Sequence, residues 1–258
     1  RLTVNGTLTN NGGILANGEN ASAYVSGGGA GGGIYINCGT LAGAGSITAN
    51  GGSGAVNNNT GGGGGGRIAI LYDTNSHTGI TTAYGGTGYN GGGNGGGGTI
   101  YRKDSGQTQG DLTVDNGTMT DGITPLPISA NYPITLTNGT FLINGTSTFT
   151  HLMLMEDATL FVNGVSTFDT MTIMDSATVT HRDADTSDVY AASFTVTGDL
   201  DIQPGGKIDV SSRGYLGGYS GGNNSIYGRT SGNTTTNGST DYCGGSYGGL
   251  GGQGSSGG

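Results

Sequence analysis

The chain has 258 residues, of which 60 are glycine, and its formal net charge is −9. Its 8 Lys and Arg residues are scattered, so no basic patch marks a nucleic-acid surface, and we predict no nucleic-acid partner. No apolar run approaches the roughly 20 residues that a membrane-spanning helix requires, so we predict no membrane span either. Charged residues make up only 10% of the chain, and no apolar stripe recurs at about 3.6 residues, which argues against a helical fold.

Two interpretations fit so much glycine. A low-complexity chain of this kind is often disordered, because glycine loses more backbone entropy on folding than any other residue. Against disorder, β-branched runs such as Arg67–Tyr72 and Phe141–Ile143 recur at fixed intervals. We therefore predict an ordered all-β protein, and specifically a right-handed parallel β-helix, or β-solenoid.

Residues 1–110 repeat with a period of about 33. The expected strand starts at Leu2, Ile34, Ile68 and Ile100 keep this spacing. Glycine runs precede the last three of these strands, at residues 27–33, 61–66 and 91–98. The additional residues of each coil therefore form a Gly-rich excursion at one corner.

Flexible loops are the default for such excursions. The alternative is polyglycine-II packing beside the solenoid, in extended left-handed helices with three residues per turn. The C-terminal segment favours this alternative, because glycine falls at every third position there. These glycines are Gly245, Gly248, Gly251, Gly254 and Gly257.

Residues 111–193 form a more compact region, with a period of 19–22. Residues 141–149 return as residues 160–168, and stacked coils would place Phe141 over Leu160, with strands about 4.8 Å apart. The other expected pairs are Ile143 with Val162, Leu152 with Met171, and Leu154 with Ile173. Antiparallel hairpins at the Asn-Gly pairs are the alternative, but they do not explain why whole coils recur in the same direction.

One outward pair stands out in the compact coils. If their neighbours point inward, Leu142 and Phe161 point outward and stack on each other. Exposed apolar patches of this sort mark contact surfaces. We expect this pair to contact a neighbouring subunit or the Gly-rich layer.

Residues 194–258 begin like a further Gly-rich module that the next subunit or repeat completes. Residues 194–200 echo residues 2–8, and joining the final glycines to Arg1 would regenerate the repeat. We see no polar cap that would protect the strand edges at either end. We therefore predict stacking on copies of the same chain, head to tail in a fibre, or on adjacent repeats of a longer chain. The expected contact residues at the ends are Arg1, Leu2, Val4, Gly257 and Gly258.

Few residues suggest a site for chemistry. Asp183, Asp185 and Asp188 are candidate oxygen ligands for Ca²⁺, although the Gly and the distal Glu of an EF-hand loop are missing, and a solvated loop is the alternative. Cys38 and Cys243 either form a disulfide in an oxidising compartment or remain free thiols.

The histidines offer no catalytic arrangement. His77, His151 and His181 have no partner at a recognisable spacing, and Glu occurs only at Glu19 and Glu156. We predict that the chain is not an enzyme and that, apart from the possible Ca²⁺, it has no cofactor.

Residues 205–218, together with residues 61–72 and 83–88, resemble Gly-rich parallel β-helix modules of very large secreted or surface bacterial proteins. The resemblance covers residues 1–110 and 194–258, and the coils between them only generically. It implies an extracellular or cell-surface location and a role in adhesion or scaffolding.

We expect a structural subunit or tandem-repeat segment of an extracellular filament, surface appendage or adhesin. A carbohydrate-binding or carbohydrate-active β-helix protein, with surface glycans as partners, is the alternative. An ice-binding solenoid is a more distant one, because Thr-x-Thr recurs but not as a long flat array.

Overall fold

The computed structural model describes residues 1–56, 59–127, 129–240 and 242–254. Over these residues the protein is all-β and contains no helix. Fifteen strands belong to one long sheet and three to a small second sheet. Among the described residues, all strand pairs are parallel except one, which is antiparallel. The long sheet does not close on itself.

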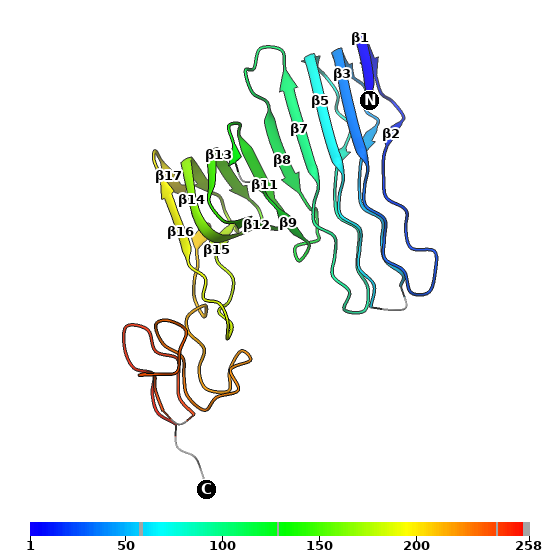
Figure 1. The fold of residues 1–258 in the computed structure, drawn as a ribbon. Coiled ribbons are helices and arrows are strands. Elements are labelled where there is room, and N and C mark those ends of the chain that lie inside the picture. Colours follow the sequence, from blue (N-terminus) through cyan, green and yellow to red (C-terminus); the bar gives the residue numbers. More distant parts are fainter. Residues whose placement is uncertain (57–58, 128, 241, 255–258) are drawn as a thin grey trace.

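The N-terminal part of the long sheet consists of four strands that lie side by side (Figure 1). They are β1 (Leu2–Thr9), β3 (Gly33–Ala42), β5 (Arg67–Asn75) and β7 (Thr99–Asp104). Ile34 pairs with Ile68, and Ile68 with Ile100, as the repeat predicts. The small sheet accompanies these strands and contains β2 (Gly13–Leu15), β4 (Ser46–Thr48) and β6 (Thr81–Thr82).

The first strand departs from the expected spacing. Leu2 pairs with Ile36 and not with Ile34, whereas Thr7 pairs with Thr40. The register shifts between Val4 and Thr7, where β1 contains one residue more than β3. The constant interval between the expected strand starts does not predict this bulge, because the additional residue lies inside the strand.

The chain reverses direction between its two regular parts. Strand β8 (Asp111–Asp115) pairs with β7 in the antiparallel sense, with Tyr101 opposite Leu112. Parallel pairing then resumes, since β11 (Ile134–Thr137) pairs with β8. The expectation of parallel stacking throughout is therefore wrong at this junction, where a short connection of residues 105–110 allows only a hairpin.

The compact region pairs in the predicted register. Its main strands are β12 (Thr140–Asn144), β13 (Ser147–Met155) and β14 (Thr159–Ile173). Phe141 pairs with Leu160 and Ile143 with Val162 across β12 and β14. The pairs Leu152 with Met171 and Leu154 with Ile173 join β13 to the second part of β14. Two ladders of strands therefore meet along β14, and their apolar residues share one core.

Six short strands complete the sheet. They are β9 (Ile123–Pro125), β10 (Ser129–Ala130), β15 (Thr178–Thr180), β16 (Ala192–Val196), β17 (Leu200–Ile202) and β18 (Lys207–Ile208). Two clusters of buried apolar residues result, one in the N-terminal strands and one in the compact region. In the second cluster the rings of Phe149 and Phe168 stack with their centroids 5.4 Å apart.

The Gly-rich excursions form two columns beside the N-terminal strands. We call residues 16–21, 49–54 and 83–87 the first glycine column, and residues 27–32, 61–66 and 93–98 the second glycine column. Along the second column, Gly28 and Gly31 donate their N–H groups to the carbonyls of Gly61 and Gly64, at 3.0 and 2.9 Å. The residues that donate these hydrogen bonds to the next layer of the second glycine column therefore recur at every third position.

Hydrogen bonds also join the two columns to each other. Gly63 donates its N–H to the Gly52 carbonyl (2.9 Å) and accepts the N–H of Gly86 (2.7 Å). In the first column, Asn17 Oδ1 accepts the N–H of Asn50 in the next layer, at 2.8 Å. The excursions are thus hydrogen-bonded on two sides, unlike flexible loops.

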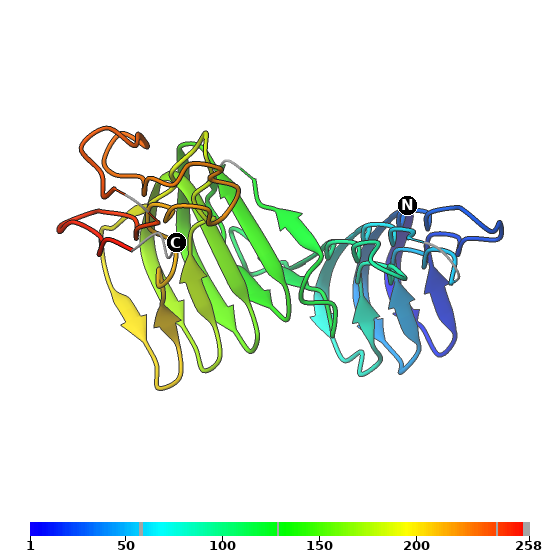
Figure 2. The same cartoon turned by 90° about the horizontal axis from the view of Figure 1, so that it is seen from below.

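Residues 211–254 contain turns and no strand among those described. They extend away from the strands in Figure 1 and overlie the compact region in the view of Figure 2, and Arg213 lies over the Phe161 ring of β14. The glycines spaced three apart in this segment differ in their surroundings. A Cβ on Gly245 or on Gly251 would meet a backbone carbonyl oxygen at 2.1 or 2.2 Å, whereas one on Gly248 would meet nothing within 4 Å. Gly257 lies outside the described residues. Period-three packing of this segment is therefore not seen over Gly245–Gly251.

Candidate assembly site

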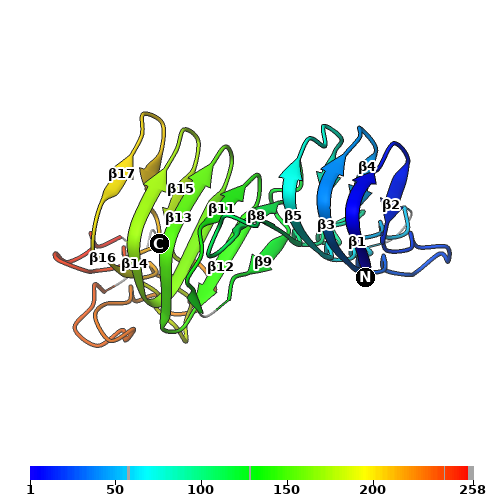
Figure 3. The ribbon, with the colours of Figure 1, turned by 90° about the horizontal axis from the view of Figure 1, so that it is seen from above.

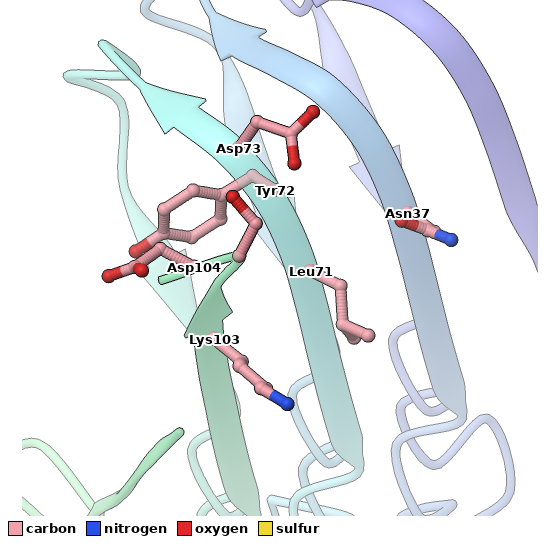
Figure 4. A pocket seen from close by; sticks show the side chains of 7 residues that line it. Asn37, Leu71, Tyr72, Asp73, Lys103 and Asp104 are labelled. Atoms are coloured by element: carbon pink, nitrogen blue, oxygen red, sulfur yellow. The ribbon is translucent and has the colours of Figure 1, made fainter. Parts of the chain in front are cut away.

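A shallow groove crosses β3, β5 and β7 on one face of the sheet. Its volume is about 180 Å³, and it is lined by Asn37, Leu71, Tyr72, Asp73, Lys103, Asp104 and Ser105. Figure 4 shows that Asp73 and Lys103 point away from each other. The Asp104 carboxylate accepts the backbone N–H groups of Gly106 and Gln107, at 2.8 and 3.1 Å, and so holds the turn that follows β7. The groups of this groove do not converge on one point.

Cys38 is one of the residues that line a neighbouring hollow, together with Asp73, although its side chain is buried in the core. Burial raises the pKa of the Cys38 thiol, and the negative charge of Asp73 raises it further. A raised pKa keeps the thiol protonated at neutral pH, and the protonated form is a poor nucleophile.

Cys38 and Cys243 are both free and buried, so the structure has the free thiols and not the alternative disulfide. Cys38 packs in the core of the N-terminal strands. Cys243 lies in the C-terminal segment, where its sulfur accepts the N–H of Gly228 at 3.1 Å. The two segments lie far apart (Figure 1), so the thiols cannot meet within one chain.

The three aspartates proposed for Ca²⁺ do not form a cluster. No group of acidic, His or Cys side chains suited to a metal occurs among the described residues. Asp183 pairs with the Arg213 guanidinium at 2.6 Å. Asp185 accepts the backbone N–H groups of Ser187 and Asp188, both at 2.7 Å, which lowers the pKa of Asp185. The carboxylates of Asp183 and Asp185 thus bind other groups of the protein and do not converge on one point.

The pair Leu142 and Phe161 is in register, as expected, but Leu142 is buried within the chain itself. Leu142 pairs with Pro125 on its other side, and the Arg213 guanidinium lies 5.4 Å from the centre of the Phe161 ring. The expectation that Leu142 is exposed on an outward face is therefore wrong, whereas contact of this pair with a neighbouring subunit or the Gly-rich layer stays a prediction. The sequence could not show that β9 pairs beside Leu142 or that Arg213 lies over Phe161.

The free edge of β1 lies at one end of the molecule (Figure 3). Among the described residues, β1 pairs with β3 alone. Ile36, the partner of Leu2, is fully buried, and so is Ile70 in the next strand, whereas Leu2 is 37% exposed. Leu2 occupies the same column of side chains as these isoleucines and lacks only a neighbour on one side.

A second free edge, formed by β16, β17 and β18, lies at the opposite end (Figure 3). These strands pair only with β14 and β15 among the described residues. Leu200 and Ile202 are 41% and 45% exposed, although their partners Met171 and Ile173 are buried. The apolar ladders of the core thus continue to this edge and end in partly exposed side chains, a hydrophobic surface of the kind that marks a contact site.

Some of the residues that were expected at an end contact lie at the β1 edge. Leu2 and Val4 lie on the β1 edge, and the Arg1 guanidinium lies 5.1 Å from the centre of the Tyr35 ring. Gly257 and Gly258 lie outside the described residues. Leu200 and Ile202 were not among the expected residues, and the signal for them is their spacing of 29 residues from Met171 and Ile173.

Comparisons of the chain with protein-family models, curated proteins and solved structures find no match. No helix that could cross a membrane is present in the part of the chain that the structure describes.

Proposed function

We propose that this chain is a structural segment of an extracellular filament, surface appendage or adhesin, and that its layers continue from one copy to the next. The observation that carries this proposal is the exposure of the apolar ladders at both free edges. Side chains that are fully buried in the interior strands, such as Ile36 and Ile173, have half-exposed counterparts at Leu2 and Ile202.

The fold in this proposal is a right-handed parallel β-solenoid with polyglycine-II columns at one corner. Equivalent strands of consecutive repeats pair with each other in parallel, and this pairing supports the solenoid. Hydrogen bonds that recur at every third residue in two directions support the columns, because a polyglycine-II helix has about three residues per turn and hydrogen-bonds only to its neighbours.

The energetics favour association at the edges. Complete burial of a large aliphatic side chain contributes about 1.5–3 kcal/mol, and each edge presents several that are only partly buried. Proteins that must avoid edge pairing place charges, prolines or bulges on their outer strands. Strand β1 reads Leu-Thr-Val-Asn-Gly-Thr-Leu-Thr and contains neither a charge nor a proline, although it has the bulge after Val4.

The extracellular placement rests on the resemblance to Gly-rich modules of secreted and surface proteins. The buried, unpaired Cys38 and Cys243 are compatible with this placement, because burial protects free thiols from oxidants.

Negative-stain microscopy and sedimentation test the proposal. The protein is expected to form fibres with a regular axial repeat, and Leu2→Lys is expected to shorten or abolish them. A charge at this position would be buried in the contact. Thr3→Lys is the matched control, because it adds the same charge on the outward side of the same strand. Dispersed monomers at high protein concentration, or equal effects of the two variants, would contradict the proposal.

A further inference from the structure

The two free edges match each other in sequence and in spacing. The apolar positions of the β1 edge are Leu2, Val4 and Leu8, and those of the opposite edge are Phe194, Val196 and Leu200. In both edges the first two positions are two residues apart and the third follows four residues later.

Neither edge has the spacing of the interior strand on which it stacks. Val4 and Leu8 pair with Cys38 and Leu41, which are only three residues apart. At the other end the same mismatch occurs, since Val196 and Leu200 pair with Phe168 and Met171, again three residues apart. Each edge therefore contains one residue more than its interior neighbour, so the three apolar positions of the two edges can face each other in one register.

We infer that the partner of the β1 edge is the β16–β17 edge of a second copy of this chain, in parallel pairing and in a single register. This inference rests on the proposed end-to-end stacking. In this register Phe194 pairs with Leu2, Val196 with Val4, and Leu200 with Leu8. Contact between two different surfaces is heterologous, so each copy leaves one edge free for the next copy and growth is open-ended.

The side chains between the apolar positions are compatible with this register. Thr195 faces Thr3 and Thr197 faces Asn5, so the outward side presents neutral polar pairs. Asp199 and Asp201 face Thr7 and Thr9, and no pair brings two like charges together, an arrangement that would weaken the contact. Leu2 and Leu200, which are 37% and 41% exposed in one copy, gain the missing neighbour.

A crosslinking experiment tests the register. The pair Thr3→Cys and Thr195→Cys places two outward thiols on directly facing residues. Adjacent strands are about 4.8 Å apart, within the roughly 4.4–6.8 Å of Cα separation that a disulfide spans. Thr3→Cys with Thr197→Cys is the matched control, because a shift of two residues adds about 6.6 Å along the strand and exceeds that range.

Under mild oxidation the first double variant is expected to form a ladder of covalent oligomers on a non-reducing gel, at least tenfold faster than the control. The crosslinked residues are identified by mass spectrometry of the peptides, which distinguishes them from the buried Cys38 and Cys243. The single variant Thr3→Cys is expected to form no dimer. A dimer of this variant would show that two β1 edges pair with each other in a closed two-fold contact and would overturn the inference.

The outcomes separate the inference from the function on which it rests. If fibres form but the control crosslinks as fast as the facing pair, the register is wrong and the structural role stands. If neither fibres nor crosslinked oligomers form at any concentration, both are wrong.

Discussion

The glycine columns make a prediction that contrasts two neighbouring residues. Gly63 and Gly64 belong to the same run in the second glycine column, and neither has a positive φ. A Cβ on Gly63 would lie 2.0 Å from the Gly29 carbonyl oxygen, whereas a Cβ on Gly64 would find Gly96 O as its nearest atom, at 3.9 Å. We expect Gly63→Ala to destabilise the protein strongly and Gly64→Ala to leave it unchanged or slightly more stable.

The magnitude follows from the contacts of Gly63. Its added Cβ needs about 1.4 Å more space to reach the 3.4 Å of an ordinary contact, and the opposing atoms are backbone that cannot rotate away. Overpacking costs about 1–3 kcal/mol, and the two hydrogen bonds of Gly63 contribute about 1 kcal/mol each. Gly63→Ala should therefore lower the free energy of unfolding by about 3–5 kcal/mol. Gly64→Ala should raise it by up to about 1 kcal/mol, since alanine restricts the unfolded chain.

Chemical denaturation followed by far-UV circular dichroism measures both variants against the parent chain. Native-state hydrogen exchange of the Gly52 and Gly86 amides then reports whether the loss is local to the columns. Equal shifts of the unfolding midpoint in Gly63→Ala and Gly64→Ala would refute the reasoning, because they would show that the columns are not close-packed in solution.

Three further predictions concern single side chains. Asn50→Ala should lower the free energy of unfolding by about 1–2 kcal/mol, because it leaves the N–H of Tyr84 without the Oδ1 acceptor that lies 2.8 Å away. Asn50→Asp keeps an acceptor and should lower the free energy of unfolding by less in the same denaturation assay. Cys38 should react with a thiol reagent only after unfolding, because it is buried and its pKa is raised; fast reaction of the native protein would contradict this. The backbone N–H of Ser211 is the main cause that lowers the pKa of Asp209 to about 2, so the stabilisation from Asp209 should be complete above pH 3.8 and lost as the pH falls towards 2. The stability difference between the parent and Asp209→Asn should shrink over that pH range, and a difference that grows on acidification would exclude the hydrogen bond as the cause.

Strand pairing in the compact region was predictable from the sequence alone. Residues 141–149 and 160–168 share their apolar alternation and their Asn-Gly turn, and the structure pairs Phe141 with Leu160 as that similarity predicts. Identical patterns in consecutive repeats are buried best when they stack in register, because a shift by one residue would turn every apolar side chain to the other face.

The candidate site was only partly predictable. Leu2 and Val4 were expected at an end contact and lie at a free edge, but Leu142 was expected to face outward and is buried. A strand pattern specifies which side chains share a face and not what lies against that face, and here the Arg213 guanidinium lies over the Phe161 ring. The sequence left open whether Cys38 and Cys243 pair and whether the three aspartates converge, because both depend on where distant or loop residues are placed.

The glycine positions show most clearly what the sequence determines about this protein and what only the tertiary structure decides. The sequence by itself determined that one corner of each N-terminal repeat is nearly free of side chains, and that the interior strands repeat at constant intervals. Only the tertiary structure decided which glycines are indispensable. Gly63 faces a backbone carbonyl of the neighbouring layer, whereas the Gly64 position, one residue later, has room for a side chain. Ala30, in the same run as Gly29, is exposed, as expected of a position that tolerates a side chain. That distinction depends on the rotation and spacing of two columns of backbone, which arise only when the layers stack.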